Sequence, residues 1–336
     1  MGVLVSFSSR PPGIHPTTHR RSGRSGLRLS ALGLNLGNGL SPDRPDPVTD
    51  HALDLGITHF DISSRTGTHH LPEKGIGCLL PWHGRRDEMV ISLRSGPATG
   101  PLAGFGSRKQ ILSGLDSTLR RTGLTYVDIL YAHRLDPETP LEESMGALAA
   151  AVQQGKALYT GLSAFPLSAV RPAAKLLSQS GTPCTVYQGS YSLLDRRAEK
   201  GLLDVLHNLG IGFVAGAPLA QGRLSTARRQ EQQPYPDTHP ALPGLEHIAA
   251  GRRQSLDQLA LSWCLRAPTV TSALVTTSRL DHLLSAHQTV HHARLSPAEL
   301  AALDACCPPV QPTEPRAGAC KAFGVTGGVV ESDVGC

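Results

Sequence analysis

Short apolar runs alternate with amphipathic segments along the chain from about residue 31 onward. The segments between the runs place apolar residues three or four positions apart, which is the spacing of a helix with one buried face. Such alternation predicts parallel strands, because each parallel pairing needs a crossover connection that is usually a helix. The expected strands cover residues 32–36, 58–62, 89–93, 127–131, 157–162, 184–188, 212–215 and 270–275.

Three of the expected helices begin with recognisable capping signals. Ser107 precedes a segment in which Ile111 and Leu115 share one face, so Ser107 is the predicted N-cap. Residues 139–142, Thr-Pro-Leu-Glu, read as a capping box with proline at the first helical position. Residues 296–299, Ser-Pro-Ala-Glu, repeat that signature near the end of the chain.

The number of strand–helix units distinguishes between two α/β architectures. Eight units that close on themselves predict an eight-stranded parallel (β/α)8 TIM barrel. An open doubly wound sheet is the alternative, and it would usually carry a G-x-G-x-x-G turn between its first strand and a helix. Residues 34–39 read Leu-Asn-Leu-Gly-Asn-Gly, with no helical pattern directly after them. We therefore predict the barrel.

Composition is that of a globular protein, and it suggests how the chain is divided. The chain has 336 residues, of which 40% are hydrophobic and 18% charged, with a net charge of +5. We expect a flexible basic tail over residues 1–19, the barrel over 20–307 and a flexible C-terminal tail over 308–336. The arginines at 20, 21, 24 and 28 are expected to be solvated in the manner of the tail.

The same composition argues against several classes of partner. The basic N-terminal stretch has no interleaved aromatic residues, so we expect no nucleic-acid and no membrane partner. The seven cysteines lack the spacing of a metal site, which predicts no metal and suits reduced thiols in the cytoplasm.

A long and specific motif covers residues 123–136, which read Gly-Leu-Thr-Tyr-Val-Asp-Ile-Leu-Tyr-Ala-His-Arg-Leu-Asp. In family order it is joined by residues 21–27, by His-Phe-Asp at 59–61, by Gly-Lys-Ala-Leu-Tyr at 155–159 and by Ala-Pro-Leu-Ala-Gln-Gly at 217–222. Together these motifs resemble the aldo-keto reductase family over about residues 20 to 305. The run at 191–196 is similar to the branch of glyceraldehyde-3-phosphate reductases and potassium-channel β-subunits.

The resemblance implies hydride transfer from a nicotinamide to a carbonyl carbon, with a Tyr acid, a Lys, an Asp and a His. Asp61 and His133 match the family's Asp and His, but the tyrosine position holds Thr66 and the lysine position holds Arg94. An aliphatic hydroxyl is far too weak an acid to replace a phenol, and a guanidinium effectively never deprotonates. The catalytic positions are therefore partly altered.

Cofactor positions implied by the resemblance are also mixed. Ser163 and Gln188 match the residues that hold the carboxamide, whereas Gly216 stands where an aromatic ring stacks on the nicotinamide. Arg279 favours NADP(H), because it matches a residue that grips the 2′-phosphate. Ser278 matches a phosphate-binding position but would also serve as a helix cap with Asp281. The full set of cofactor positions is Ser163, Gln188, Gly216, Pro218, Leu219, Ser278, Arg279 and His282.

Three functions remain open from the sequence. In the first, the protein is an NADPH-dependent reductase of a small carbonyl or imine, and His133, or His69 or His70 in the substrate loop, supplies the proton. In the second, the altered barrel performs a non-redox reaction. In the third, it is a cofactor-sensing or regulatory subunit. Self-association into a homo-oligomer is compatible with each of the three. The loops at 66–72 and 228–244 are expected to set specificity.

Overall fold

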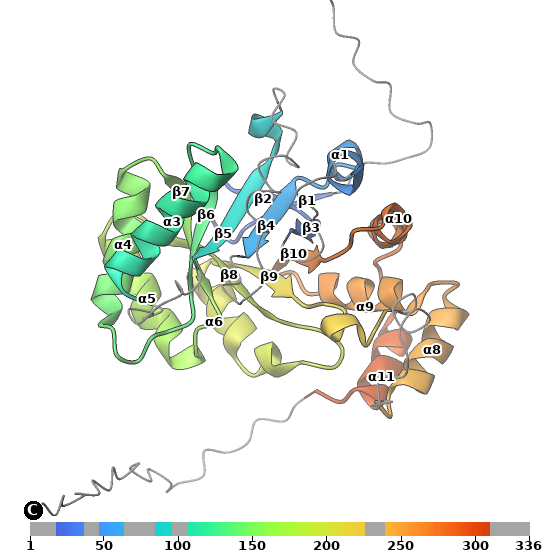
Figure 1. Cartoon of the computed structure of the whole chain (residues 1–336). Helices are drawn as coiled ribbons and strands as arrows, with labels where there is room; N and C mark the ends of the chain where they lie inside the picture. The colour runs from blue at the N-terminus through green and yellow to red at the C-terminus, as the bar shows by residue number, and fades with distance from the viewer. Residues whose placement is uncertain (1–17, 37–46, 64–84, 96–105, 226–238, 310–336) are drawn as a thin grey trace, which may run out of the picture.

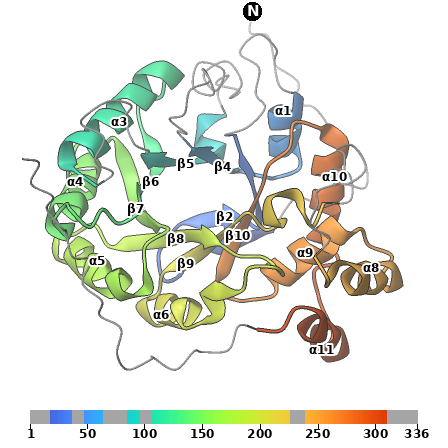
Figure 2. The same ribbon diagram turned by 60° about the horizontal axis from the view of Figure 1, so that its bottom comes forward.

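The computed structural model describes residues 18–36, 47–63, 85–95, 106–225 and 239–309. Within these residues, eight parallel strands close into a barrel that helices surround, as predicted (Figures 1 and 2). The order around the barrel is β10, β3, β4, β5, β6, β7, β8 and β9. The strands are β3 (Leu32–Asn35), β4 (His59–Ser63), β5 (Val90–Ser95), β6 (Val127–His133), β7 (Ala157–Ser163), β8 (Cys184–Ser190), β9 (Gly212–Gly216) and β10 (Val270–Val275).

Closure joins the first and last of these strands. β3 and β10 pair in parallel, with Leu32 opposite Ala273 and Leu34 opposite Val275. The helices around the barrel are α1 (Pro47–Asp54), α3 (Arg108–Thr122), α4 (Leu141–Gln153), α5 (Leu167–Gln179), α6 (Leu202–Leu209), α8 (Leu242–Gly251), α9 (Leu256–Leu265) and, after the last strand, α10 (Leu280–Thr289). A final helix, α11 (Pro297–Cys306), packs on α8 outside the ring (Figure 2).

Two of the three predicted helix caps are confirmed and the third is wrong. The Ser107 hydroxyl accepts a hydrogen bond from the backbone N–H of Gln110, and Ser296 with Glu299 forms a complete capping box. The box predicted at 139–142 is absent, because the Thr139 hydroxyl donates to the Asp136 carboxylate at 2.7 Å. Helix α4 begins one residue later than expected, at Leu141, with Pro140 as its N-cap.

An N-terminal hairpin closes the end of the barrel at which the strands begin. Strands β1 (His19–Arg21) and β2 (Arg28–Ser30) pair antiparallel, and Leu29 packs inside the barrel with Ile129 and Val214. The Arg20 guanidinium donates to two carbonyls that flank the start of β10, those of Leu265 and Val270, at 2.8 and 3.0 Å. The expectation that the N-terminal arginines are solvated is therefore wrong for Arg20, which is half-buried, whereas Arg21, Arg24 and Arg28 are exposed as expected. The side chains of Arg20, Arg21 and Arg24 donate to backbone carbonyls.

Arg196 ties the end of the barrel domain to its middle. This buried side chain donates to Glu199 at 2.8 Å, to Asp304 at 2.7 Å and to the carbonyl of Cys307 at 2.6 Å. Its guanidinium also lies 5.0 Å from the ring centroid of Trp263 on α9. A guanidinium offers five donors in a fixed fork, so one side chain can hold helix α11 against the barrel.

The described helices include none that is both long and apolar enough to cross a membrane.

Glycine at position 161 on β7 is required by close packing inside the barrel. A Cβ there would lie 2.5 Å from the Tyr131 ring and 3.0 Å from the carbonyl of Val186. We predict that Gly161→Ala lowers the free energy of unfolding by about 1–3 kcal/mol, as overpacked cores do. Urea denaturation measures this change. The matched control is Gly251→Ala on α8, where a Cβ meets nothing within 4 Å. Equal stability of both variants would contradict the prediction.

Candidate active site

Five of the sequence-predicted site residues lie at the ends of consecutive strands. Asp61, Arg94, His133, Ser163 and Gln188 belong to β4, β5, β6, β7 and β8. His133 is in register with Ser163, and Ser163 with Gln188. Parallel strands bring all their carboxyl ends to one rim, which is where barrel active sites form. Thr66, His69 and His70 lie outside the described residues, as does most of the loop predicted at 228–244.

Asp61 forms an ion pair with Arg94 at this rim. The Asp61 side chain is fully buried, and its Oδ2 lies 2.8 Å from Nη2 of Arg94. The Ser92 hydroxyl donates to the other carboxylate oxygen, Oδ1, at 2.7 Å. A buried carboxylate is stable only when it is paired and hydrogen-bonded, and both conditions are met here. Arg94 thus pairs with Asp61, at the position where the sequence resemblance implies a lysine.

His59 supports Asp61 from inside the barrel, which the sequence interpretation missed. Its Nε2 lies 3.2 Å from Oγ of Ser92, and its Nδ1 lies 3.1 Å from Oγ of Ser272 on β10. Ser92 gives its only proton to Asp61, so Nε2 of His59 must donate to Ser92, and Nδ1 must accept from Ser272. Burial lowers the pKa of His59 to about 4, although the charge of Asp61 acts to raise it. The ring is neutral at pH 7.

A sequence signal for His59 does exist. Side chains two apart on a strand share a face, so the alternation that turns Asp61 inward also turns His59 inward. Gly33 on the neighbouring strand β3 provides the space, because a Cβ there would lie 2.8 Å from Nδ1 of His59.

His133 is half-buried at the end of β6, and its Nδ1 lies 3.0 Å from Oγ of Ser163. Burial, and after it the positive charges of Arg94 and Arg134, together lower its pKa to about 4 against the opposing charge of Asp61. The ring is therefore neutral at pH 7. Acid catalysis by an imidazolium with an ordinary pKa, one of the expectations from the sequence, does not fit this environment. A neutral ring can still donate a hydrogen bond from one nitrogen.

Ser163 and Gln188 form a buried polar pair beside His133. They are 2% and 3% exposed, and the Ser163 hydroxyl donates to Oε1 of Gln188 at 3.3 Å. A hydroxyl and a primary amide side by side supply the donors and acceptors that a carboxamide group needs. At Gly216 on β9 a Cβ would lie 3.3 Å from the carbonyl of Gly189. A side chain at this position would require this backbone to shift by a few tenths of an ångström.

Backbone strain collects at the same rim. Arg134, Ala164 and Ala217 each follow directly after a strand, β6, β7 and β9, and have φ values of 67°, 55° and 50°. Left-handed backbone costs a residue with a Cβ about 1–2 kcal/mol. Strained residues cluster at functional sites because the surrounding structure holds them there. The strain is an independent mark of the site.

A second part of the rim lies at the end of β10. A cavity of about 50 Å³ there is lined by Leu219, His282 and Ala286, together with Ser225, Asp257, Leu261, Val275, Thr276 and Thr277. Leu219 and His282 were predicted to bind the cofactor, and the fold brings them together. The cavity lies beside the start of helix α10, to which His282 and Ala286 belong.

The other predicted cofactor residues near α10 are placed differently. Ser278 and Arg279 are both exposed, and the Arg279 guanidinium pairs with Asp281 at 2.7 Å. Ser278 does not cap the helix, contrary to the alternative interpretation of the sequence. Arg279 is the N-cap residue, and its backbone N–H donates to the Thr277 hydroxyl at 3.0 Å. The hydroxyl that accepts a hydrogen bond in the turn before α10 is therefore that of Thr277, one residue before the predicted Ser278.

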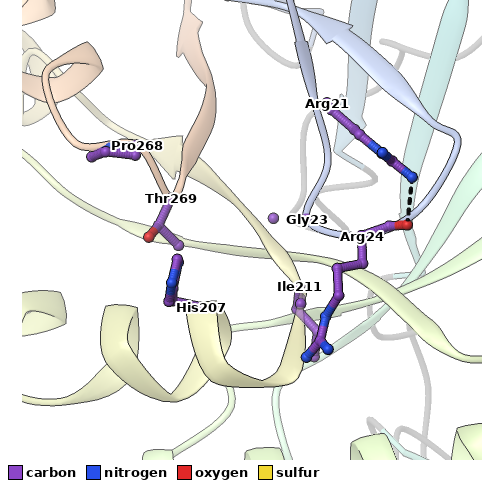
Figure 3. A pocket seen from close by; sticks show the side chains of 9 residues that line it. Arg21, Gly23, Arg24, His207, Ile211, Pro268 and Thr269 are labelled. Carbon is purple, nitrogen blue, oxygen red and sulfur yellow. Dashed lines mark hydrogen bonds between the residues drawn. The ribbon is translucent and has the colours of Figure 1, made fainter.

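A cavity of about 230 Å³ lies at the opposite end of the barrel, between the N-terminal hairpin and α6 (Figure 3). Arg21 and Arg24 line it, but their guanidiniums donate to the carbonyls of Ser25, Arg24 and Asn208. These arginines fasten the hairpin, so the cavity is part of the barrel's closure and not of the site.

No group of three or more His, Cys, Asp or Glu side chains in the described part of the chain could hold a metal ion. The cysteines that the structure describes, at 184, 264, 306 and 307, are free thiols.

Comparison with known proteins agrees with this geometry. The model of the aldo/keto reductase family matches residues 31–308. The chain belongs to the aldo/keto reductase family. It is 39% identical to the L-glyceraldehyde 3-phosphate reductases of Escherichia coli O157:H7 and Escherichia coli strain K12. Each similarity extends over 315 residues, 85% of this chain and 91% of the relative. The family is one of oxidoreductases, and the motif at 123–136 therefore indicated it correctly.

Neutral His133 makes stability depend on pH in a defined direction. Its folded pKa of about 4 lies below the ordinary 6.5, so below pH 6.5 the unfolded chain binds a proton that the folded chain does not. Stability must fall as pH drops from 6.5 toward 4. We predict that the free energy of unfolding of His133→Gln exceeds that of the parent by about 1 kcal/mol at pH 5. Between pH 7 and pH 8 the free energy of unfolding of the variant should change little. Thermal melts across this range measure it, and parallel pH curves for the two proteins would contradict it.

Proposed function

We propose that this protein reduces a small carbonyl or imine compound with NADP(H), using a proton-handling arrangement that differs from the family's Tyr and Lys. The observation that carries the proposal is the convergence of Asp61–Arg94, His133 and Ser163–Gln188 on one rim of the barrel. When bound, the cofactor supplies a hydride. The chain's own residues bind it, orient the substrate and handle the proton.

Ser163 and Gln188 are the residues that would hold the carboxamide, while Leu219 and His282 would line the adenosine end. Arg279 supports the choice of NADP(H) over NAD(H). Its pair with Asp281 is exposed on both sides, and such pairs are worth roughly 0–1 kcal/mol. A doubly charged 2′-phosphate can therefore displace Asp281 from the guanidinium.

Proton supply falls to His133 in this proposal. As a neutral ring it donates a hydrogen bond to a carbonyl oxygen when the proton is on Nε2, and Arg94 adds positive potential nearby. A substrate that is already a cation, such as an imine in its protonated form, needs no strong acid. Histidines 69 and 70 remain further candidate donors from the sequence.

The charge around His133 also bears on the substrate. Arg94 and Arg134 both act on the ring, whereas Asp61 is the carboxylate that opposes them. The rim therefore favours a substrate that carries an anionic group. The relatives from Escherichia coli are named for the reduction of a phosphorylated aldehyde, L-glyceraldehyde 3-phosphate. A small phosphorylated or carboxylated aldehyde is the substrate class we would test first.

Replacement of the family's Lys by Arg94 favours a second candidate function, in which the protein does not reduce a carbonyl. A barrel that binds the cofactor without turning over a carbonyl would be a cofactor-sensing subunit or would perform a non-redox reaction. Asp61 is held by Ser92 and Arg94 in either case, so the ion pair itself does not distinguish the candidates.

Cofactor binding is the first test. We predict that NADPH raises the melting temperature, because a ligand that binds only the folded state stabilises it by about 2.7 kcal/mol at 100 times its Kd. Gln188→Leu removes the amide beside Ser163 and should weaken NADPH binding by roughly tenfold, the worth of a typical hydrogen bond. Thr160→Val, on the same strand as Ser163 but in the middle of β7, is the control. No response of the parent protein to millimolar NADPH would rule out the reductase.

Restoring the family's residues separates the reductase from the binding-only candidate. We predict that Thr66→Tyr combined with Arg94→Lys raises kcat for glyceraldehyde-type aldehydes by at least tenfold, because a phenol beside a lysine is a far better acid than threonine. Steady-state NADPH oxidation measures the rate. A parent protein that is already as fast as the restored variant would mean that the present residues perform the acid step fully.

A further inference from the structure

Ser163 stands between two groups that compete for its single proton. Its hydroxyl donates to Oε1 of Gln188 at 3.3 Å, and the same oxygen lies 3.0 Å from Nδ1 of His133. A serine hydroxyl carries one proton and two lone pairs. Since that proton points to Gln188, the contact with His133 requires Nδ1–H of the ring to donate to Ser163.

The free protein therefore holds His133 in a defined tautomer. The neutral ring has one proton, and Ser163 fixes it on Nδ1. Nε2 then carries a lone pair, since the hydrogen bond that the His133 ring makes within the described part of the chain is at Nδ1. In this state Nε2 can accept a proton but cannot give one to a carbonyl oxygen. The burial and the positive neighbours that keep the ring neutral support this assignment.

We infer that Ser163 is a hydroxyl switch, which couples the arrival of the cofactor at Gln188 to the tautomer of His133. The inference rests on the proposed function, in which Gln188 and Ser163 hold the carboxamide. Gln188 accepts from the carboxamide nitrogen with its Oε1, and this contact displaces the Ser163 hydroxyl from that oxygen. Ser163 then turns its proton to Nδ1 of His133.

The proton count balances without any other reactant. Ser163 keeps its proton and changes only the acceptor, from Oε1 of Gln188 to Nδ1 of His133. His133 loses the proton on Nδ1 to solvent and gains one from solvent on Nε2, so its charge stays zero. The ring then presents an N–H donor at Nε2. Ser163 is accordingly a positioning residue, and it arms His133 only in the loaded site.

The arrangement has a consequence for the order of events at the site. Before loading, a carbonyl compound meets an Nε2 lone pair, which repels its oxygen. After loading, it meets an N–H donor. Substrate binding is thus favoured only when the hydride source is in place, although no residue has to move farther than a hydroxyl rotation. Such ordering needs only the differential hydrogen bonding of two states.

The test reads the tautomer directly. Protein labelled with 15N at histidine gives two-bond proton–nitrogen correlations that distinguish Nδ1–H from Nε2–H, and His133→Gln identifies the signal by its loss. At pH 7 we expect Nδ1–H in the free parent protein and Nε2–H after saturation with NADP+. The oxidised cofactor is used so that no turnover occurs.

Variants at position 163 make the test specific. Ser163→Ala should bind NADP+ within about tenfold of the parent, the loss of one hydrogen bond, and should show the same His133 tautomer pattern with and without cofactor. Ser163→Thr keeps the hydroxyl and should restore the switch. Thr160→Val removes a hydroxyl elsewhere on β7, where it donates to the Thr182 carbonyl, and should switch as the parent does.

The outcomes separate this inference from the proposed function. Binding of NADP+, read from the melting temperature, without a change of tautomer in the parent would overturn the switch alone. A switch that persists in Ser163→Ala would overturn the role of Ser163. Failure of NADP+ to bind at all would overturn both the switch and the reductase. A melting curve for each variant, taken first, confirms that it is folded.

Discussion

Closure of the parallel sheet is the constraint on which the rest of this structure depends. Each strand can satisfy its backbone only between two neighbours of the same direction, so β10 must return to β3 and every connection must cross outside the barrel. All strands therefore end at one rim. Side chains from five consecutive strands, β4 to β8, meet there although they are far apart in the sequence. The strained residues after β6, β7 and β9 mark the same rim.

Periodicity and motif spacing were sufficient for the fold, because burial on both faces gives each strand an apolar run that is easy to recognise. They failed where a polar side chain had two available partners. Thr139 could cap a helix or bind Asp136, and the N-terminal arginines could face water or backbone carbonyls. Each choice depends on a group distant in sequence or on exact geometry. Neither the distant group nor the geometry can be read from the pattern of residues.

The site was predictable in position but not in electrostatics. Strand ends located Asp61, Arg94 and His133, yet the protonation of His133 depends on burial and on neighbours that only the fold supplies. His59 is the clearest example, since its role comes from Ser92 and Ser272 on two other strands. The exchange of Lys for Arg preserved the pair with Asp61 because a carboxylate accepts either cation. The ion pair is thus retained although the lysine of the family's acid chemistry is not.

The seam between β3 and β10, where the barrel closes, also determines which strand edges stay unpaired while the chain is being synthesised. Until the segment around residue 275 has emerged, β3 and β9 are open edges, and a nascent barrel with such edges can pair with other chains. The bond between His59 and Ser272 joins residues 213 positions apart and spans this seam. The support beneath Asp61 is consequently incomplete in any unfinished chain. A partly synthesised protein has the rim's residues but lacks the framework that holds them, so function arises only with the final strand.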